Sequence, residues 1–272
     1  MHTLKQIFIY PIKGLPGISC ETAMAMPKGL RFDRRFMLVT ATGDFISQRQ
    51  FPILTQFSTS ISEDLLMVKF SNQSKTIRIP LSPMFGRPMK VKVWDDVVWV
   101  FEPDEMVSNW FSDCLQMKCH LVFMPEKAER MVDPTYTRGE DTVSFADAFP
   151  YLLVNTKSLE LLNSKLPSPI SINRFRPNFI IEGIEAFEED NWSEFLIGDK
   201  LFRAVKPCAR CQVVTIDQRS GIGGAEPLKT LATFRTQKNK VLFGENSLLH
   251  GTPGLVQTGM KLTVMSFKKI AT

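Results

Sequence analysis

The sequence lacks any long hydrophobic run. None of its apolar stretches approaches the roughly 20 residues that a helix needs to cross a bilayer. The N-terminus, MHTLKQIFIYPIKG, also lacks the basic head, long apolar run and small-residue cleavage site of a secretory signal. We therefore expect a cytoplasmic protein with no membrane span.

A concentrated charge of one sign is also missing. The chain has 33 Lys and Arg against 28 Asp and Glu, a formal charge of +5, and the basic residues are scattered without a block of like charges. A nucleic-acid-binding protein of this size usually concentrates its basic residues on one element. This pattern argues against a nucleic-acid partner and favours a small anionic ligand.

Cysteine and histidine are scarce. The five cysteines are an odd number in a chain without an export signal, which indicates reduced thiols rather than a disulfide framework. The three histidines, His2, His120 and His250, are far apart in sequence and form no i, i+4 pair. A histidine-centred metal site or catalytic triad is therefore not expected.

Short strands dominate the first hundred residues. β-Branched and aromatic residues alternate there with Gly, Pro, Asn and Asp at intervals of about ten residues, which is typical of a barrel or sandwich. The fold class predicted is mainly β (α+β), and WDDV at 94–97 is expected to be a hairpin turn. The predicted strands are 4–14, 34–40, 45–49, 65–71, 75–81 and 91–102.

The second half of the chain combines strands with short helices. A first helix over 103–116 would place Met106, Trp110 and Cys114 on one face, with Cys114 as a buried core thiol. We expect domains at 1–119 and 120–272, packed together, and a polar loop at 126–141 near a substrate entrance. Further strands are predicted at 120–125, 151–155, 176–183, 200–205 and 211–217, and further helices at 156–167 and 227–236.

The stretch VKPCARCQVVTID, residues 205–217, raises the main chemical question. A structural zinc needs four ligands, and this chain offers one C-x-x-C and a separate Cys114–Cys119 pair. A thioredoxin-like dithiol belongs at a strand-to-helix junction, whereas this motif leads into a predicted strand. Two unreactive cysteines, or a single thiolate ligand to a soft metal, also fit.

Strand alternation would place Cys211, Thr215 and Asp217 on one face of that segment. Arg210 beside Cys211 would lower the pKa of the thiol and could bind a phosphate. The residues alone leave these alternatives open.

Several motifs, in one order, resemble the MOSC family, named after the C-terminal domain of molybdenum cofactor sulfurase. The combination covers nearly the whole chain and implies an N-terminal β-barrel domain packed against a MOSC β-barrel domain with a few short helices. The motifs are YPIKG (10–14), RFDRRFMLV (31–39), ISQRQFPIL (46–54), SFADAFPYLLVN (144–155), NRFRPNFIIEG (173–183), EEDNWSEFLIGD (188–199), KPCARCQVVTIDQRSG (206–221) and EPLKTLATFR (226–235).

Within this family the pattern looks like that of the amidoxime-reducing components and bacterial reductases of N-hydroxylated bases. That resemblance implies a molybdenum-dependent oxidoreductase that binds molybdopterin and reduces N-hydroxylated bases and amidoximes, a detoxification activity. It assigns Cys211 as the catalytic residue and metal ligand. The residues implied in cofactor binding are Lys13, Gly14, Arg34, Arg35, Arg176, Asn178, Arg210, Thr215 and Asp217.

This assignment is chemically reasonable. Arginine and lysine bind a pterin phosphate well, and thiolate sulfur suits molybdenum held by a dithiolene. Gly14 replaces the serine of the PIKS motif, so a phosphate contact there would come from its backbone N–H.

Two further departures concern partners. The C-x₄-C-x₂-C cysteines of a ferredoxin domain are missing, so the expected electron donor is a separate protein of the ferredoxin, flavoprotein or cytochrome type. Pyridoxal phosphate is associated with the family only through the aminotransferase-like domain of the full sulfurase, which we do not find, so sulfurase activity is not expected. The alternative function is non-catalytic cofactor binding or transport of sulfur as a persulfide on Cys211.

Overall fold

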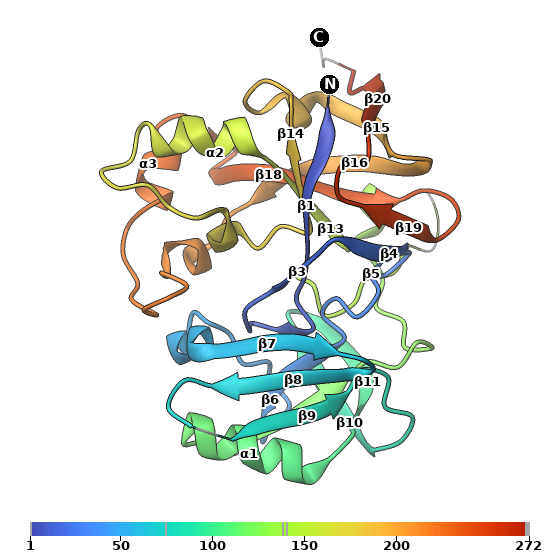
Figure 1. Cartoon of the computed structure of the whole chain (residues 1–272), viewed down its shortest axis with the longest axis vertical. Helices are drawn as coiled ribbons and strands as arrows, with labels where there is room; N and C mark the ends of the chain where they lie inside the picture. The colour runs from blue at the N-terminus through green and yellow to red at the C-terminus, as the bar shows by residue number, and fades with distance from the viewer. Residues whose placement is uncertain (1, 74, 138, 140, 270–272) are drawn as a thin grey trace.

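The computed structural model describes residues 2–73, 75–137, 139 and 141–269. It is mainly β, which confirms the predicted fold class, with three short α-helices in the described part of the chain. Figure 1 shows two halves stacked along the longest axis, with the three-stranded β7–β9 sheet in the lower half and the large sheet that contains β16 and β18 in the upper half.

The larger sheet has nine strands and crosses the sequence from end to end. Along its path the order is β20-β15-β16-β18-β13-β14-β1-β3, and β17 pairs with β18. Strand β1 is antiparallel to β14, with Ile7 opposite Phe179, whereas β13 and β14 are parallel. The strands are β1 (Thr3–Ile9), β3 (Ile18–Cys20), β13 (Tyr151–Asn155), β14 (Phe179–Glu182), β15 (Trp192–Ile197), β16 (Lys200–Ala209), β17 (Thr236–Gln237), β18 (Lys240–Leu249) and β20 (Leu262–Phe267).

The other half contains a five-stranded sheet of order β10-β11-β12-β6-β2 and a three-stranded sheet β7-β8-β9. Strands β10 and β11 form the hairpin predicted around residues 94–97, with Val93 opposite Asp96. A fourth sheet, β19-β4-β5, pairs a strand from near the C-terminus with two strands from the first thirty residues. The strands are β2 (Ile12–Lys13), β4 (Thr22–Met26), β5 (Gly29–Leu30), β6 (Phe36–Thr40), β7 (Phe57–Ser62), β8 (Leu65–Phe70), β9 (Thr76–Pro80), β10 (Arg87–Val93), β11 (Asp96–Glu102), β12 (Cys119–Phe123) and β19 (Gly254–Gln257).

The three helices occur where the sequence predicts them: α1 (Glu105–Leu115), α2 (Thr156–Asn163) and α3 (Leu228–Ala232). Asp104 caps α1 by accepting a hydrogen bond from the Met106 N–H. Trp110 and Cys114 are buried against the core, and burial raises the pKa of the Cys114 thiol to about 11. The expectation that Met106 shares this buried face is wrong, because its side chain is 74% exposed.

Two predicted strands are not strands. Residues 46–51 form turns and irregular backbone, because the Gln48 side chain donates to the Gly14 carbonyl (2.7 Å) and pairs with Gln218. Residues 212–215 form a 3-10 helix, η5 (Gln212–Thr215), although their β-branched composition favours a strand. Arg174 donates to the Thr215 carbonyl (3.0 Å) and thereby holds this tight turn from another segment.

The first thirty residues help to build the core of the C-terminal half. Leu4, Ile7 and Leu30 are buried in the same cluster as Phe179 and Phe202. Segments from both ends of the chain therefore fold together, although the motifs of the two halves are consecutive in sequence. The predicted boundary between residues 119 and 120, at the start of β12, stays a prediction.

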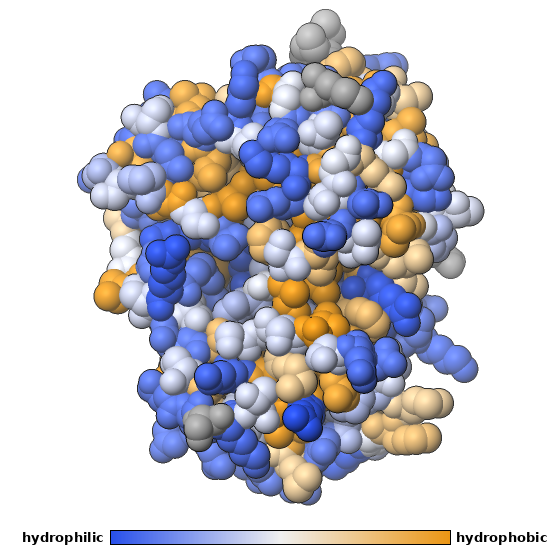
Figure 2. All heavy atoms as spheres, viewed as in Figure 1, coloured by the Kyte–Doolittle hydropathy of each residue, from blue (hydrophilic) through white to orange (hydrophobic). Residues whose placement is uncertain are grey.

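Within the part of the chain that the structure describes, no helix has the length and apolar character needed to span a membrane. In Figure 2, polar and charged side chains cover most of the visible face, and apolar ones gather near its middle, where the two halves meet.

Candidate functional site

A cavity of about 280 Å³ lies where loops from both halves meet. Its lining contains seven basic side chains and, among the described residues, a single carboxylate, Asp147. Such a concentration of positive charge in a hollow favours an anionic ligand. The basic residues are Lys13, Arg34, Arg49, Arg174, Arg176, Lys206 and Arg210.

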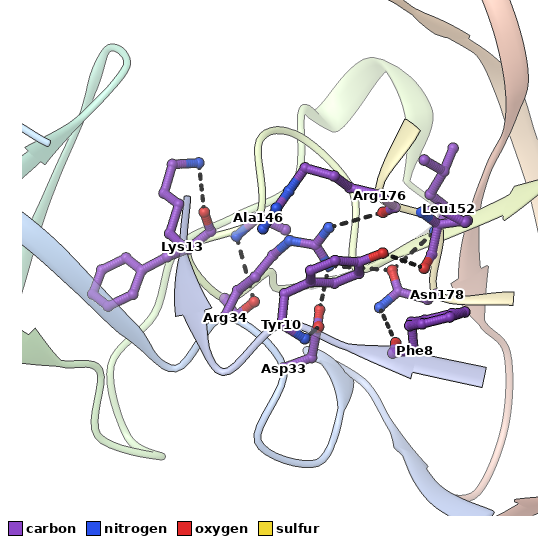
Figure 3. A network of polar contacts seen from close by, with 12 residues as sticks. Phe8, Tyr10, Lys13, Asp33, Arg34, Ala146, Leu152, Arg176 and Asn178 are labelled. Carbon is purple, nitrogen blue, oxygen red and sulfur yellow. Dashed lines mark hydrogen bonds and ion pairs between the residues drawn. The ribbon is translucent and has the colours of Figure 1, made fainter. Parts of the chain in front are cut away.

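Two of these arginines enclose the ring of Tyr10. The Arg34 guanidinium carbon lies 4.6 Å from the ring centroid and that of Arg176 lies 4.3 Å from it. Arg34 also pairs with the fully buried Asp33 (2.5 Å), whose other carboxylate oxygen accepts the Tyr10 backbone N–H (2.7 Å). Figure 3 shows these side chains converging beside Asn178. Tyr10 and Asp33 lie within the YPIKG and RFDRRFMLV motifs, but the sequence analysis assigned neither of them a role.

Burial and neighbouring charges shift the pKa values of Arg176 and Tyr10. Burial lowers the pKa of Arg176 to about 10, and the neighbouring Arg34 charge acts in the same direction. Burial also raises the pKa of Tyr10 to about 12.

Arg34 and Arg176 both have a positive φ, of 50° and 55°. Non-glycine residues pay for this backbone conformation, and such strain is concentrated at functional sites.

Asn178 connects the strands to this group. It is almost completely buried, donates to the Phe8 carbonyl (3.2 Å) and accepts from Arg34 Nη1 (3.3 Å) and the Leu152 N–H (3.3 Å). Its side chain therefore fixes β1 and β13 relative to Arg34, besides lining the cavity.

Lys13 forms the opposite wall of the site. Its Nζ donates to the Phe145 carbonyl (2.7 Å) and to Asp147 Oδ1 (2.5 Å). Burial lowers the pKa of Lys13, and Asp147 opposes that shift. Although desolvation acts against ionisation, the charge of Lys13 keeps the pKa of Asp147 well below its usual range. Trp94 Nε1 donates to the same Asp147 oxygen (3.2 Å).

The loop that carries Asp147 is held by Arg130, which the sequence analysis missed. Arg130 is 5% exposed and donates to the carbonyls of Ser144 (3.0 Å), Ala146 and Asp147 (2.9 Å). The sequence analysis predicts a polar loop over 126–141, and it does not anticipate the burial of Arg130 within that loop. The sequence carried no signal, because a buried and a solvated arginine look alike in a polar stretch.

Gly14 follows Lys13 with a φ of +88°, in the region that favours glycine. A Cβ at this position would lie 3.3 Å from Leu54 Cδ1 and 3.6 Å from the Ile46 carbonyl oxygen. The local backbone therefore favours glycine at this position.

Both cysteines of the C-x-x-C stretch line the cavity, and they differ in environment. Arg210 Nη1 lies 2.9 Å from Cys208 Sγ, and its Nη2 donates to the Phe175 carbonyl (2.5 Å). The predicted contact of Arg210 with Cys211 is thus directed to Cys208 instead. Cys211 is exposed and starts the η5 turn. Arg210 Nε is buried and has no hydrogen-bond partner in the described part of the chain, which leaves a donor for a ligand.

The structure separates the other predicted residues. Lys13, Gly14, Arg34, Arg176, Asn178, Arg210 and Cys211 line one cavity, whereas Arg35, Thr215 and Asp217 lie outside its lining.

Arg35 points away and pairs with Glu126 (2.7 Å), so Arg34 is the arginine of this pair that faces the cavity. Asp217 pairs with Arg174 (2.9 Å) and accepts the Ser220 N–H (3.0 Å), which keeps the pKa of Asp217 low. Thr215 and Asp217 are therefore placed to shape the turn, and Arg174, which lines the cavity, is a residue that sequence reasoning missed.

A protein-only metal site is not evident. The described residues include no group of three or more His, Cys, Asp or Glu side chains that could together hold a metal ion. A metal at Cys211 would therefore need most of its ligands from a cofactor.

The chain is similar to known proteins along most of its length. The sequence matches the MOSC domain family over residues 140–263 and the MOSC N-terminal beta barrel domain family over residues 1–118. It is 33% identical to mitochondrial amidoxime-reducing component 1 of Mus musculus, over 86% of this chain and 71% of that protein, and 28% identical to the Homo sapiens protein of that name, over 94% and 81%. It is 31% identical to the molybdenum cofactor sulfurase of Oryza sativa over 89% of this chain, which spans about a third (32%) of that protein's length.

Proposed function

The chain belongs to the family of MOSC-domain proteins that includes the amidoxime-reducing components, and from this premise we propose its function. It is a molybdenum-cofactor-dependent oxidoreductase that reduces N-hydroxylated compounds such as amidoximes and hydroxylated bases. In this reaction the N–O bond breaks, two electrons and two protons are taken up, and water leaves.

One observation carries the proposal. An exposed thiol, Cys211, opens into the same cavity as seven basic side chains. The positive charge suits the phosphate of molybdopterin, and the thiolate suits a soft metal already held by dithiolene sulfur. The residues present thus fit this cofactor, which when bound supplies the two-electron chemistry.

The chain's own residues bind and orient the cofactor. Lys13, Arg34 and Arg176 are the proposed phosphate ligands, because their charged groups line the cavity and are largely withdrawn from water. Asn178 positions Arg34, and Arg210 has a free buried Nε for a further polar contact.

The remaining assignments are supporting ones. Cys211 is the proposed metal ligand and catalytic residue, and Gly14 is proposed to contact the phosphate through its backbone N–H, at a position where a side chain would be strained. Thr215 and Asp217 shape the turn after Cys211 and are proposed to act through it. Arg35 has a partner in Glu126 and does not line the cavity, so its proposed contribution is to support the Arg34 segment.

The setting of the reaction is also part of the proposal. All five cysteines are free, which suits a reducing compartment such as the cytoplasm, whereas the amidoxime-reducing relatives are named mitochondrial. Cell fractionation distinguishes these locations. The electrons are proposed to come from a separate donor protein, and removal of N-bound oxygen would serve detoxification.

The test is turnover of an aromatic amidoxime, benzamidoxime, with reduced methyl viologen as electron source and protein from a host that makes the cofactor. We expect wild type and the control Cys20→Ala, which changes a thiol outside the cavity, to form benzamidine. Cys211→Ala should lose at least about 100-fold in rate, as expected for a residue that holds the catalytic metal.

Two results would contradict the proposal. Equal rates for Cys211→Ala and wild type would remove this thiol from the reaction. Cofactor-loaded wild type without any turnover would favour the non-catalytic alternative, in which the protein carries cofactor or sulfur. A mass increase of one sulfur atom on Cys211 would identify the persulfide carrier.

A further inference from the structure

The β10–β11 hairpin exposes an apolar and basic face. On its buried side, Val91 and Val98 pack into the core of the five-stranded sheet. On the other side, Trp99 is 65% exposed and Val97 is 56% exposed. Monomeric proteins rarely leave tryptophan this open, and when they do it often marks a binding site.

Lysines share this face. Lys92 lies opposite Val97 and Lys90 lies opposite Trp99 in the antiparallel register. The Lys90 ammonium is 5.9 Å from the centre of the Trp99 ring. Neither lysine has an ion-pair partner among the residues that the structure describes. The β10–β11 face, defined as Lys90, Lys92, Val97 and Trp99, therefore combines apolar area with uncompensated positive charge.

This face leads directly to the functional cavity. Lys92 lines a groove together with Phe45, Arg49 and Trp94, and these last three also line the cavity that contains Cys211. Arg49 stacks on Trp94 at 4.8 Å, and Trp94 occupies the turn that joins β10 to β11. Asp44 and Asp95 also border the groove, so the net positive charge is on the strands rather than at the mouth.

We infer that the β10–β11 face is the docking site for the electron-donor protein and that this donor is acidic around its redox centre. The inference rests on the proposed function, which needs electrons from a separate protein. Aromatic side chains provide much of the binding energy of interfaces, and complementary charge accelerates association and orients the partner. A partner seated here would lie beside the cavity mouth, where electrons are needed.

A lipid surface is the less favoured occupant. The exposed side chains belong to the flat face of a sheet, where lysines alternate with apolar residues, and they do not form an amphipathic helix. A membrane pressed against this face would also cover the groove that borders the cavity. A protein with a small, transient interface can contact the same apolar and basic side chains without covering the groove.

The test compares two electron sources for one enzyme. An acidic [2Fe–2S] ferredoxin is the protein donor, and reduced methyl viologen, which needs no docking, is the small one. The variant Lys90→Glu/Lys92→Glu reverses the charge of the face. Lys69→Glu/Arg78→Glu is the matched control, because these cations are also exposed on strands and lie outside both the groove and the cavity.

At low ionic strength we expect Lys90→Glu/Lys92→Glu to lower kcat/KM for ferredoxin at least about tenfold, and the wild-type rate to fall with added salt. Trp99→Ala should also lower it, and because both lysines remain, its rate should still fall with added salt as the wild-type rate does. The dye-driven rate should stay within about twofold of wild type in all variants, which also shows that they fold.

Four results would overturn the inference. The first is an unchanged ferredoxin-driven rate in the lysine variant, and the second is an equal loss in the Lys69/Arg78 control. The third is a wild-type enzyme that the dye reduces but ferredoxin does not. The fourth is binding to vesicles of phosphatidylcholine and phosphatidylserine that the lysine variant alone loses, since this would assign the face to a membrane. A wild type inactive with the dye would instead refute the proposed function, and the docking site with it.

Discussion

At the scale of single residues, the site depends on charges that balance one another within the protein. Lys13 is neutralised by Asp147, and Arg34 by the buried Asp33, while Arg176 contacts a carbonyl and a ring and has no ion-pair partner among the described residues. An incoming phosphate would therefore find Arg176 uncompensated and would compete with Asp147 for Lys13. This competition makes Asp147 the residue whose removal is most informative.

Asp147→Asn tests the link between Lys13 and Asp147. We expect the pKa of Lys13 to fall further, because burial lowers it and the Asp147 charge is the main opposing influence. The measurement is an NMR titration of the labelled lysine side chains. Asp199→Asn, which removes the partner of Lys200 at the surface, is the control and should leave Lys13 unchanged. A Lys13 pKa that stays constant in Asp147→Asn would refute this coupling.

Gly14→Ser tests whether the backbone selects glycine. A serine at a φ of +88°, with its Cβ 3.3 Å from Leu54, should lower the free energy of unfolding by about 1–3 kcal/mol. Urea denaturation measures this loss. Gly223→Ser is the matched control, because a Cβ at Gly223 meets no atom within 4 Å. Equal free energies of unfolding for the two variants would show that backbone conformation does not select glycine at position 14.

At the scale of elements, a buried acidic cluster joins the turn η4 (Glu188–Asn191) to α2 and β18. Glu189 is fully buried and accepts hydrogen bonds from Ser158 (3.2 Å) and Asn155 (3.3 Å). Burial raises its pKa to about 7, and the nearby Asp190 acts in the same direction. Glu245 is also buried, and desolvation raises its pKa well above the usual range although Lys268 pairs with it.

This cluster predicts stability that declines with rising pH. The folded state holds the Glu189 proton up to about pH 7, whereas the unfolded state releases it near the ordinary glutamate pKa of 4.5. Glu189 therefore contributes most to the free energy of unfolding below pH 4.5. As the pH rises from 4.5 to 7, up to about 3 kcal/mol of this contribution is lost.

Glu189→Gln should remove this part of the pH dependence, because its amide does not titrate. Urea denaturation of both proteins between pH 5 and 7.5 measures the difference, and Glu182→Gln, at the partly exposed end of β14, is the control. A smaller decrease of stability with pH should remain in Glu189→Gln, because burial also raises the pKa of Asp190 and of Glu245. Identical slopes in wild type and Glu189→Gln would contradict the raised pKa.

Elements with a regular hydrophobic pattern could be predicted from the sequence. The β10–β11 hairpin and α1 follow their alternation and capping residues, because local preference and tertiary packing agree there. The 212–215 turn could not be predicted. Its β-branched residues favour a strand, but Arg174, 41 residues earlier in the sequence, donates to the Thr215 carbonyl and stabilises the turn instead. The buried role of Arg130 and the Tyr10 arrangement also depend on such distant contacts.

At the scale of the whole molecule, the site exists only because the halves fold together. β1, from the N-terminus, pairs with β14, and β19, near the C-terminus, pairs with β4. The cavity receives Lys13 and Arg34 from the first forty residues and Cys211 from the other half. Family motifs identified most of these residues in advance, whereas their convergence on one cavity required the fold.

The central claim is that this cavity binds a molybdenum cofactor through Cys211. The most direct measurement is the molybdenum and pterin content per chain of wild type and Cys211→Ala, after expression in a host that makes the cofactor. The account predicts about one molybdenum and one pterin per wild-type chain, with the metal lost or its coordination altered in the variant. Wild type without molybdenum or pterin, from a host that loads other molybdenum enzymes, would contradict it.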